Sequence, residues 1–165
     1  MKFVASIVAA LAIGAVSCRV LPDGSEHASP GGLSTEALAL LRPYLKELIA
    51  ASNAEFDDRG VFLGASPHRR TADRLFDELL GSESRPGDEA IAYLLFIYTG
   101  EHPGEELICE AARRGKVMVP LIEQFSARLP KTGLEPYPKF VLGSGTLAPE
   151  ALSRIASGER CEPYD

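Results

Sequence analysis

The chain of 165 residues has few of the side chains from which metal and cofactor sites are built: histidine occurs three times and tryptophan not at all. A zinc site on a helix needs histidines one turn apart together with a third ligand. The densest acidic stretch, residues 101–106 (EHPGEE), offers one histidine beside a Pro-Gly turn. Its glutamates are better explained as favourable charges at the start of a helix. The sequence therefore predicts no metal ion and no cofactor.

Complete motifs for nucleophilic catalysis and for phosphate binding are also missing. Residues 64–68 (GASPH) begin like a nucleophile elbow, but the closing glycine is absent. Pro67 also lacks the backbone N–H that an oxyanion hole would use, so Ser66 is expected to cap a helix. The turn at residues 143–145 (GSG) is not followed by the Gly-Lys-Ser/Thr of a phosphate loop. We therefore expect no catalytic residues and a non-enzymatic protein.

Positive charge is in short supply. Lysine and arginine number 17 against 23 acidic residues, which gives a net charge of −6. Such a chain is a poor ligand for nucleic acid and for anionic lipid, because both require a dense cationic surface. The apolar run at residues 3–16 is shorter than the roughly 20 residues that span a bilayer. Any membrane attachment would therefore come from a lipid.

The first 18 residues, MKFVASIVAALAIGAVSC, carry the strongest signal in the chain. One lysine, a short apolar run and small residues at its end are typical of a secretory signal peptide. The end of this segment, Ala-Val-Ser-Cys, resembles the lipobox of bacterial lipoproteins. The resemblance covers only residues 1–18 and implies that Cys18 is lipidated and becomes the first mature residue. Ordinary cleavage after Ser17, followed by secretion in soluble form, and an uncleaved membrane anchor are the alternatives.

The resemblance divides the chain into a signal peptide (1–17), a flexible tether (18–32) and a domain (33–165). The tether is rich in Pro, Gly, Ser and charge, as a leash between a lipid and a domain should be. Removal of residues 1–17 takes Lys2 away and leaves a mature charge of −7. Anchoring at the cell membrane or at the outer membrane is implied, with the domain facing the periplasm. Arg19 after the cysteine, where Asp would favour inner-membrane retention, points to the outer membrane.

The three cysteines are Cys18, Cys109 and Cys161. If Cys18 is lipidated, Cys109 and Cys161 remain as a potential pair in an oxidising compartment. Their disulfide would close a loop worth roughly 4 kcal/mol by the loop-entropy estimate. The alternative is a buried Cys109 and a Cys161 that frays with the C-terminal end.

Apolar residues at helical spacing predict an all-α fold, a compact bundle of about five or six short helices. Ser34 and Ser66 are expected to cap the first two, and Pro43 to kink or break the first near Arg42. Asp88 should cap a buried third helix over residues 90–98, for which a strand is the alternative. Three further helices are expected at residues 103–114, 116–129 and 149–157. Residues 88–129 are faintly similar to helical repeats of the HEAT or armadillo kind, although no second copy recurs at a fixed period.

Two cationic clusters stand out on this acidic chain. One contains Arg69, Arg70 and Arg74, and the other contains Arg113, Arg114 and Lys116. Each is either a solvated helix face or a patch that binds a partner.

Together these features predict a lipid-anchored cell-envelope protein with a protein-binding or assembly role. Its expected partners are the membrane, through the lipid on Cys18, and a protein, but not nucleic acid. An envelope immunity protein that neutralises a toxin is one alternative. A small envelope hydrolase using Ser66 or His102 is another.

Overall fold

The computed structural model describes residues 32–98, 101–129 and 147–161, and at 101 and 102 it describes only the backbone. These residues form six α-helices and one 3-10 turn, which confirms the predicted all-α fold. The signal peptide, Cys18 and almost all of the tether lie outside the described residues. No helix in the described part of the chain has the length and apolar character needed to cross a membrane.

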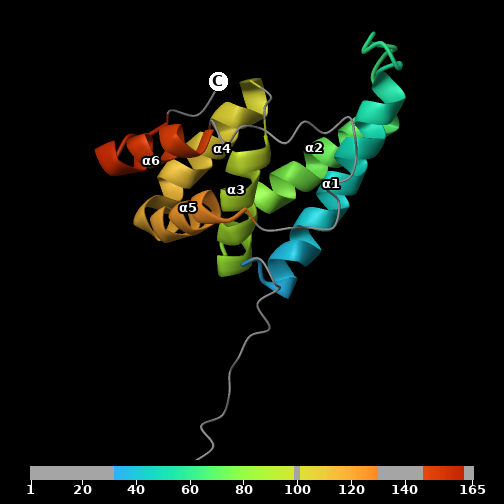
Figure 1. Ribbon diagram of the computed structural model, residues 1–165. Coiled ribbons are helices and arrows are strands. Elements are labelled where there is room, and N and C mark those ends of the chain that lie inside the picture. The colour runs from blue at the N-terminus through green and yellow to red at the C-terminus, as the bar shows by residue number, and fades with distance from the viewer. Residues whose placement is uncertain (1–31, 99–100, 130–146, 162–165) are drawn as a thin grey trace, which may run out of the picture.

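Helix α1 (Thr35–Glu55) and helix α2 (Pro67–Leu80) lie side by side as a hairpin (Figure 1). As predicted, Ser34 and Ser66 are the N-caps, and their hydroxyls accept hydrogen bonds from the amides of Ala37 and Arg69. The predicted break at Pro43 does not occur, because α1 runs through this residue as one helix. Both Pro43 and Ala39, whose carbonyl loses its usual donor, are exposed. Water can therefore replace the missing hydrogen bond.

Helix α3 (Arg85–Ile97) is the centre of the molecule. Its N-cap is Ser84, whose hydroxyl accepts a hydrogen bond from the Gly87 amide, and not Asp88 as expected. The reason is that Pro86 fits the first turn of a helix, where its missing N–H is no loss. Every residue from 89 to 97 is buried. The helical interpretation of this apolar run is therefore confirmed and the strand alternative is wrong.

The C-terminal half consists of α4 (Glu101–Arg114), η1 (Gly115–Val117), α5 (Met118–Ala127) and α6 (Leu147–Ser157). Figure 1 shows α4, α5 and α6 on one side of α3 and the α1–α2 hairpin on the other. Helix α3 contacts each of the other five α-helices. In a solenoid each unit would touch only its neighbours, so a compact bundle describes this part of the chain better than a repeat array.

A buried carboxylate joins the start of the domain to the central helix. Glu89 on α3 is buried, and its Oε2 accepts a hydrogen bond of 2.8 Å from the backbone amide of Ser34. The N-terminus of α1, where the predicted tether would join the domain, is therefore held against α3.

Candidate functional site: an apolar loop between α1 and α2

The loop between α1 and α2 presents three consecutive large apolar side chains to solvent. Val61 is 53 %, Phe62 58 % and Leu63 64 % exposed. We call these three residues the apolar tip. They lie at the end of the hairpin that points away from α4, α5 and α6 (Figure 1). Single exposed apolar residues are common on protein surfaces, whereas adjacent ones indicate an interaction site.

The loop is held in one shape by a turn that Asp57 organises. Asp57 Oδ1 accepts hydrogen bonds of 2.8 Å from the amides of Arg59 and Val61. The Asp57 amide donates in turn to the Val61 carbonyl at 3.0 Å. Gly60 provides the reversal with a φ of +78°, in the left-handed region that glycine adopts without steric cost.

Backbone and ring contacts continue the turn toward α1. Phe56 and Phe62 form an isolated antiparallel bridge, and their ring centroids lie 5.5 Å apart. The Leu63 amide donates to the Glu55 carbonyl at 2.7 Å. The tip is therefore the end of a miniature hairpin.

The base of the loop is closed by Glu55, which is 2 % exposed. Its Oε1 accepts a hydrogen bond of 3.0 Å from the Ser66 amide, and its Oε2 accepts two from the Arg69 guanidinium at 2.7 and 3.1 Å. The hydrogen bond from Arg69 is the main reason why the pKa of Glu55 lies below its ordinary value. One carboxylate thus ties the end of α1 to the start of α2.

These contacts leave the apolar tip exposed but fixed. Ordering a flexible loop on binding costs conformational entropy, which reduces affinity. A preformed loop avoids most of that cost. The arrangement is suited to insertion of the tip into an apolar pocket of another molecule.

The first cationic cluster does not form a free basic patch. Arg69 is committed to the buried Glu55, and Arg74 pairs with Glu78 one turn later on α2. Arg70 is exposed. The role of Arg69 is thus to support the neighbouring apolar loop.

The second cluster is also largely engaged within the bundle. The Arg114 side chain is only 5 % exposed and binds Asp88, Glu110 and the Leu80 carbonyl. Arg113 pairs with Glu110 and Glu83, whereas Lys116 is exposed. Burial and ion pairing therefore leave few of these six cations available to a partner.

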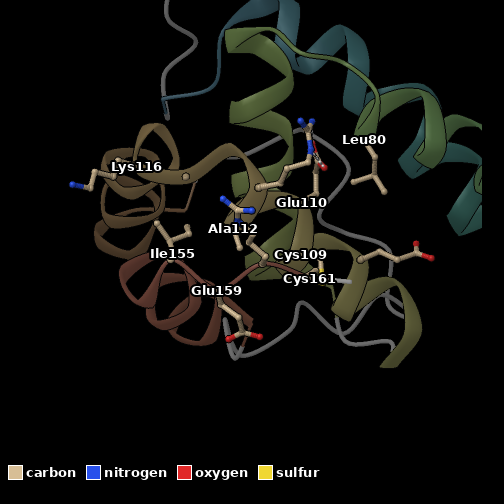
Figure 2. A pocket seen from close by; sticks show the side chains of 13 residues that line it. Leu80, Cys109, Glu110, Ala112, Lys116, Ile155, Glu159 and Cys161 are labelled. Carbon is tan, nitrogen blue, oxygen red and sulfur yellow. Dashed lines mark hydrogen bonds and ion pairs between the residues drawn. A yellow bond between two sulfur atoms is a disulfide. The ribbon is translucent and has the colours of Figure 1, made fainter. Parts of the chain in front are cut away.

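The structure joins Cys109 on α4 to Cys161, just after α6, by a disulfide with a Cα–Cα distance of 5.5 Å. The bond borders an open cavity of about 740 Å³ (Figure 2). Ala112 of α4 and Ile155 of α6 contribute apolar surface to it. The structure thus brings together the two cysteines that the odd cysteine count left as a potential pair. The sequence did not predict the cavity beside them.

Arg154 of α6 lies against this disulfide. Its Nη2 is 2.9 Å from Cys161 Sγ and 3.6 Å from Cys109 Sγ, and its Nη1 binds Glu105 at 2.6 Å. Glu105 and the two sulfurs form a group of potential metal ligands within 4.8 Å of one another. Cysteine binds a metal ion as a thiolate, and sulfur in a disulfide is not a thiolate. The oxidised group is therefore not a metal site.

The residues considered for hydrolysis have other roles or lie outside the described side chains. The Ser66 hydroxyl caps α2 and is buried. His68 pairs at the surface with Glu47, at 2.8 Å between Nδ1 and Oε2. The side chain of His102 is not among those described.

The residues of the apolar tip stand out in the sequence, but their exposure does not. Residues 60–64 read Gly-Val-Phe-Leu-Gly, three large apolar residues between two glycines and outside any helical period. Such a stretch is also typical of a short apolar link between two helices. What marks it as a site is exposure, which the sequence pattern does not report.

A comparison of the chain with family models, curated proteins and solved structures finds no match to any of them. The interpretation of the site therefore rests on its own geometry and chemistry.

Proposed function

We propose that this chain is a lipid-anchored cell-envelope protein that binds a partner protein through the apolar tip. The observation that carries the binding role is the exposure of Val61, Phe62 and Leu63 on a loop fixed by hydrogen bonds. Three adjacent apolar side chains held in solvent form a contiguous exposed patch of the kind that marks an interaction site. A pocket on a partner is the environment in which they become buried.

The position of the tip agrees with the anchor predicted from the sequence. The tether enters at the start of α1, and the tip follows the end of the same helix. A helix of 21 residues is about 31 Å long. A lipid on Cys18 would therefore attach the domain near one end of α1 and leave the apolar tip at the other end free for a partner.

The chemistry around the tip favours a protein over a lipid surface. Asp57, Asp58 and Arg59 lie within four residues of it, and the whole chain carries a net charge of −6. Charged groups beside an inserting loop are costly to bury in a bilayer, and an acidic protein is repelled by anionic lipids. A protein pocket can supply polar partners for these charges at its rim.

Cys18→Ser tests the anchor. Without the thiol no lipid can be attached, so labelling with a radioactive fatty acid should be lost and the domain should leave the membrane fraction. Cys161→Ser is the matched control and should still be labelled. If mass spectrometry of the wild-type protein finds no acyl group on Cys18, the anchor is disproved.

Site-specific photo-crosslinking in intact cells tests the binding surface. A photoreactive amino acid at position 62 should give one dominant crosslinked protein. The same probe at Val117, a single exposed apolar residue (52 %) in the other half of the bundle, should not. The proposal would be refuted if probes at positions 62 and 117 crosslinked to the same set of proteins, or if the probe at position 62 crosslinked only to lipid.

A double variant tests whether the tip supplies the affinity. Val61→Ser with Leu63→Ser, introduced into the chain that carries the photoreactive amino acid in place of Phe62, should abolish the crosslink from position 62. Each buried aliphatic side chain contributes about 1.5–3 kcal/mol to such a contact. The melting temperature of the double variant should stay at the wild-type value, because both side chains are exposed in the free protein. A crosslink that survives would contradict the assignment.

A further inference from the structure

We propose that the Cys109–Cys161 disulfide is a site of thiol–disulfide exchange, entered through the adjacent cavity and attacked at Cys109. The class of reactant is a thiolate, from a low-molecular-weight thiol such as glutathione or from a protein dithiol. This inference is independent of the lipid anchor and of the apolar tip.

Access is provided by the cavity itself. Both cysteines line an open space of about 740 Å³, and both are partly exposed (Figure 2). A disulfide that only stabilises a fold is ordinarily packed away from thiols. Here a molecule of the size of glutathione can approach the bond without unfolding of the helices, since ligand sites fall in the range of roughly 300–1,000 Å³.

The charges around the bond differ for its two sulfurs. Arg154 Nη2 lies 2.9 Å from Cys161 Sγ but 3.6 Å from Cys109 Sγ. Glu105 Oε1 lies 3.3 Å from Cys109 Sγ. Because a disulfide sulfur carries no hydrogen, Cys109 cannot donate a hydrogen bond to this carboxylate. A thiolate is stabilised by a neighbouring cation and destabilised by a carboxylate. Negative charge therefore accumulates more easily on Cys161.

Arg154 remains charged throughout. Glu105 and Glu159 both pair with it, at 2.6 and 3.0 Å, and the hydrogen bond to Glu105 is the main cause that raises its pKa. Its Nε is buried without a hydrogen-bond partner in the described part of the chain. The guanidinium is thus held over the sulfurs by its neighbours and needs no rearrangement to receive a thiolate.

Because the better leaving group is the sulfur with the lower thiol pKa, Cys161 should leave and Cys109 should be attacked. The incoming thiolate forms a new S–S bond to Cys109 Sγ as the Cys109–Cys161 bond breaks. The bonding pair departs on Cys161 Sγ as a thiolate facing Arg154. With a dithiol, the second thiolate then attacks its own sulfur in the mixed disulfide and releases Cys109, which takes up a proton. The dithiol is oxidised and the protein disulfide is reduced by two electrons.

Reduction would change the wall of the cavity. The disulfide is the covalent link between α4 and the segment after α6, and residues 158–161 line the cavity on that side. Once the link is cut, this segment is held only by non-covalent contacts. The cavity can then widen in response to the thiol redox state.

The test uses the full chain carrying Cys18→Ser, so that only Cys109 and Cys161 react. The oxidised protein is incubated with glutathione under native conditions, trapped with N-ethylmaleimide and mapped by mass spectrometry. Glutathione should be found on Cys109 and the maleimide on Cys161. Glutathione on Cys161, or no reaction until denaturant is added, would overturn the proposal.

Variants of Arg154 test the electrostatic part. Arg154→Gln should slow the exchange by about five- to tenfold, because the departing thiolate loses its cation. Arg154→Lys should recover most of the rate, and it keeps the experiment decisive if the Gln variant does not fold. Arg113→Gln is the matched control, since Arg113 lines the same cavity but pairs with Glu110 and Glu83. A folded Arg154→Gln protein that reacts at the wild-type rate would disprove the role of Arg154.

Discussion

Glu55 is the residue on which the geometry of the apolar loop depends. A carboxylate is expensive to bury unless it is paired and hydrogen-bonded. Glu55 meets this condition with hydrogen bonds from the Ser66 amide and the Arg69 guanidinium. Its burial therefore produces a rigid connection between two helices instead of a destabilised site.

Glu55→Gln should lower the free energy of unfolding by about 2 kcal/mol at neutral pH, because the neutral amide leaves the Arg69 guanidinium without its negatively charged partner. Urea denaturation measures the change. Glu78→Gln is the control: Glu78 pairs with Arg74 at the surface, where ion pairs contribute about 0–1 kcal/mol. Equal losses for the two variants would contradict the role assigned to Glu55.

The contribution of Glu55 should also depend on pH. Its pKa is lower in the folded chain than its ordinary value of 4.5, so the unfolded chain binds the proton more tightly. The pair therefore stabilises the folded state fully above about pH 4.5, and this stability is lost as the pH falls through the folded pKa. The difference between wild type and Glu55→Gln should shrink in urea titrations from pH 7 to pH 3. A constant difference would show that Glu55 is not the titrating group.

At the scale of elements, the short turn between α2 and α3 depends on a close backbone approach at Gly87. A Cβ at this position would lie 2.3 Å from the Ser82 carbonyl oxygen, a distance that real Cβ atoms essentially never show. The same turn is closed by the Ser84 hydroxyl, which caps α3 at the Gly87 amide. The residue is glycine for reasons of space, although it lies in the first turn of a helix.

Gly87→Ala should therefore destabilise the protein by about 2–3 kcal/mol, within the range for a steric clash with backbone. Thermal unfolding followed by circular dichroism measures the effect. Gly81→Ala is the matched control at the other end of the turn, because its Cβ would be 3.4 Å from the nearest atom and its φ is −73°. If Gly87→Ala is as stable as Gly81→Ala, the close approach is not real.

At the scale of the whole molecule, α3 joins the two halves, and the disulfide closes the C-terminal half. Helix α3 contacts every other α-helix, and the disulfide links α4 to the end of the described chain over a sequence separation of 52 residues. A cross-link over such a loop restricts the unfolded chain far more than the folded one. The C-terminal segment thus gains stability that its few buried side chains do not provide.

Cys161→Ser should reduce the free energy of unfolding by about 4 kcal/mol in urea denaturation, according to the loop-entropy estimate. Cys109→Ser should give a similar loss, and the double variant should be no worse than either single one because both remove the same bond. Additive losses would show that the cysteines stabilise the protein separately.

The sequence by itself determined the helices, whereas it offered the pairing of Cys109 with Cys161 only as one of two alternatives. Helical spacing and the serine caps at Ser34 and Ser66 are local properties, because they depend only on residues that are close in the sequence. The local patterns wrongly allowed a break at Pro43 and wrongly predicted a cap at Asp88. There, solvent exposure of the freed carbonyl and the competing cap at Ser84 decided the outcome.

Only the tertiary structure decided which side chains are available to other molecules. Arg69 and Arg114 were expected at a surface, but buried or partly buried carboxylates from other elements engage them. Val61, Phe62 and Leu63 are a purely apolar run in the sequence but are exposed, because the turn at Asp57 directs them away from the bundle. The cavity and Arg154 beside the disulfide likewise depend on the packing of α4 against α6. Exposure and long-range charge pairing are properties of the assembled chain, and no local pattern contains them.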